Sequence, residues 1–381
     1  QALERVLPWF AAFRVRLRRG VFWRYLEVNP ATPIIYEEDD YPCRYIYAGQ
    51  NRQYLFRVSH FENRINLEIF HVLTDGTGGM QFLQALCCQY LLLAHPGAFT
   101  PEQKARRWFA QHGADTEDSY VKNYTPTQKA TFQEGRSYKL RGERNMLDAL
   151  GVMHAYIPLQ PLLQLCRQKG VSITQYLAAC IGWAVYTEQL GARGHKLPVN
   201  IFLPVNLRKL FPSTTTLNFF SNIYVSLAFN RPGISFDEAL AAVKRQFEEK
   251  VTRESMLKKI SYTVGSGYSP FIRMVPLPIK NMALRAIFEA SARSSTMGFS
   301  NLGSIQMPAE FAPYVTGVAF MLSSAPREPF KCAACSYGDI FTLSFTSMLR
   351  STALQRAVVR MLSADIEGIT IETNGAIYEG M

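Results

Sequence analysis

Segments with the two-residue period of β-strands alternate along this chain with segments that have the helical period. The strand-like segments cover residues 44–49, 53–60, 64–73, 152–159, 198–208, 221–230, 297–305, 315–324, 339–347 and 368–373. The helix-like segments cover residues 3–10, 80–93, 160–169, 171–190, 235–251, 278–292 and 353–362. At the start of one helix, Ser172 and Gln175 have the spacing of a capping box. This order predicts an α/β or α+β fold of mixed sheets with flanking helices.

The length of 381 residues exceeds the usual size of one hydrophobic core, so we expect two units. Residues 97–145 are polar and without periodicity, which indicates a crossover or linker. The predicted units are therefore residues 1–145, which include the linker, and residues 146–381. The chain begins without Met inside a helix-like segment, and we expect that an earlier strand precedes it in the native protein.

The net charge is +11, from 41 basic and 30 acidic residues. Such a balance attracts anions such as nucleic acid, a membrane surface or a phosphate-bearing co-substrate. The positive charge is mostly scattered, so a nucleic-acid partner is not expected. One run, residues 13–20, alternates apolar residues with Arg14, Arg16 and Arg18. Two interpretations of that arginine face stay open, a solvated strand surface and an anion-binding ladder.

The seven cysteines are dispersed and odd in number, which suits a reducing compartment. Cys332 and Cys335 have metal-like spacing, but no second pair or nearby His completes a zinc set, so no metal is expected. The sequence shows no signal peptide and no run of 18 apolar residues. We therefore expect a cytoplasmic protein without a transmembrane segment.

The stretch from Ile69 to Gly79, IFHVLTDGTGG, carries the main functional signal. Gln81 stands where a dinucleotide fingerprint needs its third glycine, and no Lys-Ser/Thr completes a P-loop. A metal site would need more ligands than His71 and Asp75, and the chain contains no GxSxG elbow of hydrolases. Two interpretations remain on spacing alone: His71 is a general base, or it is a core histidine beside an Asp helix cap.

The strand period makes a further prediction about this motif. His71 shares its parity with Ile65, Leu67 and Ile69, so its imidazole is expected to point inward. Asp75 follows the strand, and we expect it to hold the loop by pairing with an arginine. Gly76 is expected to give the backbone conformations closed to other residues.

The motif His-x-x-x-Asp-Gly after a strand resembles the active-site motif of the CoA-dependent acyltransferase superfamily. That superfamily includes chloramphenicol acetyltransferase, condensation domains, wax ester synthases and alcohol acetyltransferases. Further segments are similar to family motifs in the expected order: Ser172–Val185, Leu203–Arg208, Leu217–Asn222 and Gly298–Ile305. The resemblance is closest to bacterial alcohol acetyltransferase-like and wax ester synthase-like proteins. Phe70 replaces the first His of the HHxxxDG form, and Leu217 replaces a glycine.

This resemblance implies two chloramphenicol-acetyltransferase-like lobes around a central tunnel. It implies transfer of an acyl group, acetyl by expectation, from acyl-CoA to a small alcohol or other hydroxyl acceptor. His71 would be the general base, with no acyl-enzyme and no permanently bound cofactor, so that Cys87 and Cys88 are bystanders. The protein is expected to be a monomer. The alternative is a non-catalytic, condensation-like interaction or carrier-protein docking module.

The resemblance also implies which residues surround the reacting atoms. Candidate donors to the tetrahedral oxyanion, and tunnel-lining residues, are Ser300, Asn301, Asn218 and Ser221. The candidate partners of Asp75 are Arg208, Arg14 and Arg16, and the sequence does not choose among them.

Overall fold

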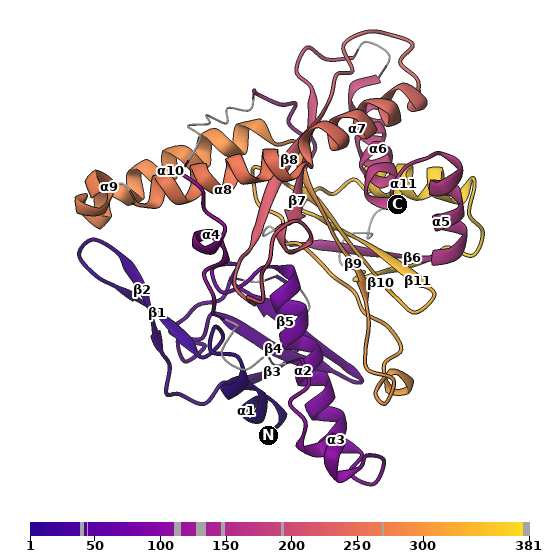
Figure 1. Ribbon diagram of the computed structural model, residues 1–381. Coiled ribbons are helices and arrows are strands. Elements are labelled where there is room, and N and C mark those ends of the chain that lie inside the picture. Colours follow the sequence, from indigo (N-terminus) through magenta and orange to yellow (C-terminus); the bar gives the residue numbers. More distant parts are fainter. Residues whose placement is uncertain are drawn as a thin grey trace.

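The computed structural model describes residues 1–38, 42–43, 45–109, 116–126, 135–145, 149–191, 194–268 and 270–375 (Figure 1). It is a mixed α/β structure of two lobes. The first lobe contains α1 (Ala2–Val6), β1 (Val15–Arg19), β2 (Arg24–Val28), β3 (Ile35–Glu37), β4 (Phe56–Phe61), β5 (Arg64–Ile69), α2 (Gly76–Ala94), α3 (Pro101–Ala105) and α4 (Ser119–Lys122). Strands β3, β4 and β5 form one sheet, and β1 pairs with β2 in a separate hairpin.

The second lobe is built on a seven-stranded sheet in the order β12-β6-β11-β10-β9-β7-β8. Its strands are β6 (Gly151–Pro158), β7 (Val199–Asn206), β8 (Phe220–Leu227), β9 (Met297–Ile305), β10 (Phe330–Tyr337), β11 (Ile340–Ser347) and β12 (Thr370–Thr373). Its helices are α5 (Leu159–Gln168), α6 (Ile173–Val185), α7 (Phe236–Lys250), α8 (Arg253–Tyr268), α9 (Pro270–Met274), α10 (Leu277–Ser294) and α11 (Ala353–Ser363). The sheet is mixed, because β9 runs parallel to β7 and β10 whereas the other pairs are antiparallel.

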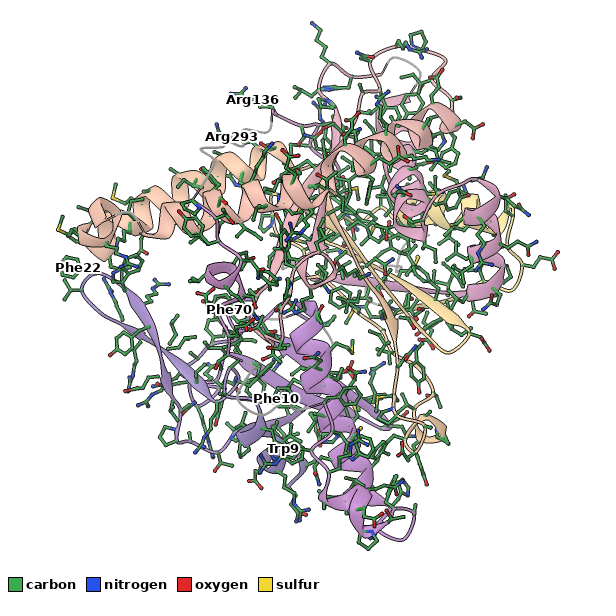
Figure 2. All side chains as sticks on the ribbon, in the orientation of Figure 1. Trp9, Phe10, Phe22, Phe70, Arg136 and Arg293 are labelled. Atoms are coloured by element: carbon green, nitrogen blue, oxygen red, sulfur yellow. The ribbon has the colours of Figure 1, made fainter. Side chains whose placement is uncertain are left out.

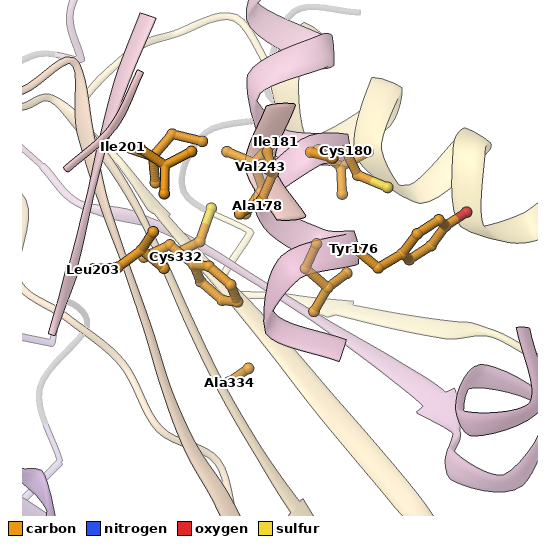
Figure 3. Close-up of a cluster of buried hydrophobic side chains, with 14 of the residues drawn as sticks. Tyr176, Ala178, Cys180, Ile181, Ile201, Leu203, Val243, Cys332 and Ala334 are labelled. Carbon is orange, nitrogen blue, oxygen red and sulfur yellow. The ribbon is translucent and has the colours of Figure 1, made fainter. Parts of the chain in front are cut away.

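Helices α5, α6, α7 and α11 contribute to the main core together with one face of this sheet. Figure 3 shows Ala178 and Ile181 of α6 packed toward Ile201 of β7 and Cys332 of β10. The helix α6 begins at the predicted capping box, in which Ser172 and Gln175 bond reciprocally. The opposite face carries buried polar side chains such as Ser300, Thr342 and Ser344, and Leu302 on this face lies next to Gly76 of the first lobe.

The first lobe has its own core of stacked aromatic rings. Phe82 of α2 stacks on Phe13 with ring centroids 3.9 Å apart, and Phe10 and Phe56 meet it edge-on. A third, smaller core joins the end of α2 to a distant part of the chain. There Phe311, which follows β9, packs on Phe99 and Trp108. The chain therefore returns from the second lobe to the first before it enters β10.

Most predicted elements are confirmed, but two predicted strands are wrong. Residues 45–49 form coil and turn (residue 44 lies outside the described part), and residues 315–324 are irregular. The second segment is apolar yet lies across the sheet, where its carbonyl groups accept bonds from Cys335 and Thr346 side chains. Conversely, β10 was not predicted, because its run of Ala, Cys and Ser lacks alternation and β-branched residues.

Two features project from the body of the molecule. Helices α8 and α10 both extend from the body in the same direction in Figure 1, and we term them the arm; the β1–β2 hairpin reaches toward its end. Across the described residues, none of the helices has both the length and the apolar character needed to span a bilayer.

Candidate functional site

His71 lies in a turn after β5, and its side chain is exposed. The turn is closed by the amide of Leu73, which donates to the carbonyl of Phe70 at 3.0 Å. The predicted inward orientation is therefore wrong, because the strand ends at Ile69 and the alternation of sides ends with it. The interpretation of His71 as a sealed core histidine is also contradicted.

The second lobe contacts His71 through its backbone and its ring. Asn218 donates from Nδ2 to the His71 carbonyl at 2.8 Å and lies 3.5 Å from the Val72 carbonyl. Phe220, at the start of β8, places its ring 5.3 Å from the imidazole. Figure 2 shows the neighbouring Phe70 at the junction of the two lobes. The turn is thus held from across the junction while the imidazole stays open to solvent.

Asp75 is buried and acts as the N-cap of α2. Its Oδ1 accepts bonds from the amides of Thr77 and Gly78 at 3.1 and 3.2 Å. Its Oδ2 accepts from the Arg208 guanidinium at 2.7 Å and from the amide of Phe219 at 2.8 Å. Both carboxylate oxygens are therefore engaged, one by the first lobe and one by the second. The helix dipole of α2 adds to the stabilisation of this negative charge.

Of the three arginines considered, Arg208 makes the ion pair with Asp75. It also donates to the carbonyls of Thr215 and Leu217, so that one guanidinium organises the loop before β8. Arg16 instead pairs with Glu27 at 2.8 Å on the β1–β2 hairpin, and Arg14, which precedes β1, is exposed. Arg18 pairs with Glu27 as well, so this carboxylate on the neighbouring strand β2 offsets much of the positive charge of the arginine face.

The junction contains two further contacts that the sequence did not indicate. The Thr74 hydroxyl donates to the carbonyl of Thr216, and Asn206 donates to the Thr77 hydroxyl at 3.1 Å. Gly78 lies inside this contact, since a Cβ there would stand 2.0 Å from the Thr216 carbonyl oxygen. That backbone approach requires a glycine.

Gly76 does not have the role that the sequence predicted. It is the first residue of α2 and does not have a positive φ, so its special conformations are not used. A Cβ at this position would instead lie 2.5 Å from a methyl of Leu302 on β9. The motif therefore approaches β9 closely, and this places the sheet face of Leu302 next to the His turn.

The candidate oxyanion donors are divided between the two faces of the sheet. Ser300 is buried and shares its parity with Leu302, so it lies on the face that meets the motif. Asn301 points the other way, with Nδ2 on the Thr174 hydroxyl of α6 at 3.1 Å and Oδ1 on the Gly303 amide at 2.8 Å. Ser221 shares the parity of the core residue Ile223, opposite that of Phe220. The structure therefore brings Ser300 toward the motif but not Asn301 or Ser221.

Tyr120, which the sequence analysis missed, supports β8 from the linker region. Its hydroxyl donates to the Phe220 carbonyl, and its ring meets Phe219 edge-on at 5.2 Å. Burial raises the pKa of Tyr120, so the phenol stays protonated as a donor. Its segment, α4, lies in a polar stretch without periodicity, and we find no sequence signal that would have identified it.

A second histidine lies half-buried on the same sheet face as Ser300. His154 of β6 has Nδ1 2.8 Å from the Ser344 hydroxyl, and the strand register aligns Ser300, Ala333, Ser344 and His154 in one row. Burial lowers the pKa of His154, while the nearby Glu372 carboxylate acts in the opposite direction. We expect this imidazole to remain neutral in the folded protein near pH 7.

The cysteines are poor nucleophiles in this structure. Burial raises the pKa of Cys87 to about 11 and that of Cys88 as well, so both remain thiols. Cys332 and Cys335 are buried in β10, and burial raises their pKa values too. The second lobe has a hollow beside Tyr138 and another beside His195, and His71 lines neither of them.

Comparison with known proteins supports the fold. No family model and no curated protein matches the sequence. Polyketide synthase associated protein 5 from Mycobacterium tuberculosis is similar with a TM-score of 0.56 at 12% identity, over 96% of this chain and 89% of that one. The epimerization domain from the third module of tyrocidine synthetase B gives 0.53 at 14% identity, over 96% and 87%. The first condensation domain of the CDA synthetase gives 0.52 at 14% identity, over 95% and 85%.

These likenesses show that the chain has the two-lobed fold of condensation domains.

Proposed function

We propose that this protein is an acyltransferase that moves an acyl group, acetyl in the simplest case, from an acyl-CoA thioester to a hydroxyl acceptor. The observation that carries the proposal is the open His71 imidazole on a turn that the second lobe holds by its backbone. A general base needs this combination, because the ring has to reach a substrate proton while its position is restrained. The resemblance to alcohol acetyltransferase-like proteins suggests the acceptor class.

In the proposed mechanism, His71 removes the proton of the acceptor hydroxyl as its oxygen attacks the thioester carbonyl. The C–O bond forms, the tetrahedral oxyanion collapses, and the C–S bond breaks to release the thiol, which takes the proton back from the imidazolium. Ser300 is the proposed oxyanion donor, because its strand face meets the motif. Asp75 takes no proton in this mechanism, since four donors already engage its two oxygens.

A direct transfer without an acyl-enzyme is favoured by the state of the cysteines. Cys87 and Cys88 follow the motif on α2, but their raised pKa values keep the thiolate population very small near pH 7. We therefore assign them no chemical role.

The proposal is tested by measuring thiol release from acetyl-CoA, and from longer acyl-CoAs, with a panel of alcohols. Wild type is compared with His71→Ala and with Ser300→Ala, and His60→Ala serves as a matched control at an exposed histidine of β4. We expect turnover that is lost with His71→Ala and retained with His60→Ala. Turnover only with a carrier-protein thioester would show that the acyl donor is a carrier protein and not CoA. Failure with every thioester would favour a docking module instead.

A further inference from the structure

An unusual amount of apolar surface is exposed on the arm and the hairpin. Of the 27 exposed large apolar side chains in the described part of the chain, 13 lie in residues 21–28 and 272–288, which we term the tip surface. They are Val21, Phe22, Trp23, Tyr25, Leu26, Val28, Ile272, Met274, Ile279, Met282, Leu284, Ile287 and Phe288. A contiguous apolar surface of this kind marks an interaction site.

The two parts of the tip surface are joined although Phe22 and Lys280, which meet there, are 258 positions apart in the sequence. The amide of Leu277, at the start of α10, donates to the Val21 carbonyl at 2.9 Å. The Lys280 ammonium donates to the Phe22 carbonyl at 3.0 Å and lies 3.4 Å from the centre of the Trp23 ring. Figure 2 shows Phe22 close to the free end of the arm. The hairpin and the arm thus present one surface.

The middle of α10 is exposed on every side. Each residue from Met282 to Phe288 is exposed, and consecutive helical residues are rotated by about 100°. Met282 therefore points to the side of the helix opposite to Leu284 and Ile287, which lie near each other. A folded protein partner covers one stripe of a helix, whereas an apolar medium that surrounds the helix covers them all. This geometry favours immersion over docking on a flat protein surface.

The charge around the tip surface is strongly positive. Residues 16–28 and 270–293 contain eight basic side chains and two acidic ones, Glu27 and Glu289. Both acidic groups are paired, Glu27 with Arg16 and Arg18, and Glu289 with Arg327. Arg19 and Arg24 stand directly opposite each other on the hairpin, a repulsive arrangement that a nearby anion would relieve. A second copy would set the same basic groups against one another.

We propose that the tip surface docks on an anionic lipid membrane, with its apolar side chains inserted among the acyl chains and its arginines at the headgroups. Apolar side chains with basic residues around them characterise interfacial membrane binding, and the Trp and Tyr of the hairpin suit the headgroup level. The inference is independent of the acyltransferase proposal, because no residue of the tip surface belongs to the His71 site.

The first test is flotation of the purified full chain with phosphatidylcholine vesicles, with and without about 30% phosphatidylglycerol. We expect wild type to float with the anionic vesicles and to be released by salt. The double substitution Met282→Glu/Ile287→Glu is expected to lower the partition coefficient by about tenfold or more. The matched control is Tyr90→Glu/Ile371→Glu, which adds the same charge at exposed apolar positions elsewhere. Circular dichroism verifies that both variants fold.

A second measurement locates the contact. Brominated lipids in the anionic vesicles are expected to quench Trp23, and Trp23→Phe is expected to remove that part of the quenching. Absence of flotation, or equal flotation of both double variants, overturns the proposal. Two other results without vesicle binding would also overturn the proposal. Self-association that the tip substitutions abolish would show that the partner is a second copy. Binding to polyglutamate that the same substitutions abolish would show that the partner is an acidic protein.

Discussion

His71 and Asp75 are four residues apart in the motif, yet their surroundings differ sharply. The imidazole is exposed and has one ring neighbour in the second lobe, whereas the carboxylate is buried and accepts four hydrogen bonds. The difference shows that the two residues of the motif have separate roles. The carboxylate joins the lobes and sets the turn, and this leaves the histidine free to meet a substrate.

The sharpest test of this division removes the imidazole alone. His71→Ala is expected to lower the turnover number of the proposed reaction by about 10²- to 10⁴-fold, because general-base catalysis contributes about that much. The free energy of unfolding is expected to change by less than about 0.5 kcal/mol, since the side chain is exposed. Initial rates and urea unfolding measure the two quantities. Substantial destabilisation would show that His71 has a structural role.

Removing the Asp75 carboxylate is expected to lower stability strongly, in contrast to removing the imidazole. Asp75→Ala leaves the Arg208 guanidinium buried without its charge partner, so we expect a loss of about 3–5 kcal/mol of stability. Activity is expected to fall as well, because the loop that carries Asn218 is no longer held. Urea unfolding measures the effect.

A double-mutant cycle with Arg208→Met separates the ion pair from its surroundings. The double variant is expected to lose less free energy of unfolding than the two single variants lose in sum, because the second substitution removes the unpaired charge. Simple additivity would mean that the two side chains do not stabilise each other.

The close backbone contact at the junction provides an intermediate test. Gly78→Ala forces a Cβ against the Thr216 carbonyl, and we expect a loss of about 1–3 kcal/mol. Gly76→Ala is the matched control, since there the obstacle is a Leu302 methyl that can rotate away. Thermal unfolding of both variants measures the difference. Equal losses at the two glycines would contradict the assigned contacts.

The smallest effect concerns the half-buried His154 of the second lobe. Because burial lowers the pKa of His154 below its usual value near 6.5, the unfolded chain binds a proton there that the folded chain does not. Its contribution to stability is therefore present above that value and is lost as the pH falls below it, by at most about 1.4 kcal/mol per pH unit. His154→Gln is expected to reduce the loss of stability as the pH falls below about 6.5. An unchanged dependence of stability on pH would show that other titrating groups cause the loss.

The sequence predicted the fold class and most elements, because strand and helix periods are local properties. The capping box at Ser172 and the stripe of α6 are examples in which neighbouring residues decide the outcome. Prediction of secondary structure failed where the conformation of a segment depends on contacts with distant parts of the chain. Strand β10 is buried in the middle of the sheet, so its sequence shows small residues without alternation.

The site was predicted in its residue types but not in its geometry. The three arginine candidates for Asp75 could not be ranked, because Arg208 reaches it through a loop 133 positions away. His71 was assigned to the strand by parity, although the turn that holds it depends on Asn218 of the other lobe. Ser221 and Asn301 were grouped with Ser300 by motif, and only the strand faces distinguish them.

The return of the chain to the first lobe after β9 has a consequence for how the protein can be made. Phe311 closes the apolar surface formed by Phe99 and Trp108, so that surface is covered only when the C-terminal half is present. A gene truncated after residue 145 would encode a product with this surface bare, and we expect it to precipitate on expression. Production from two genes would require both fragments to be synthesised together.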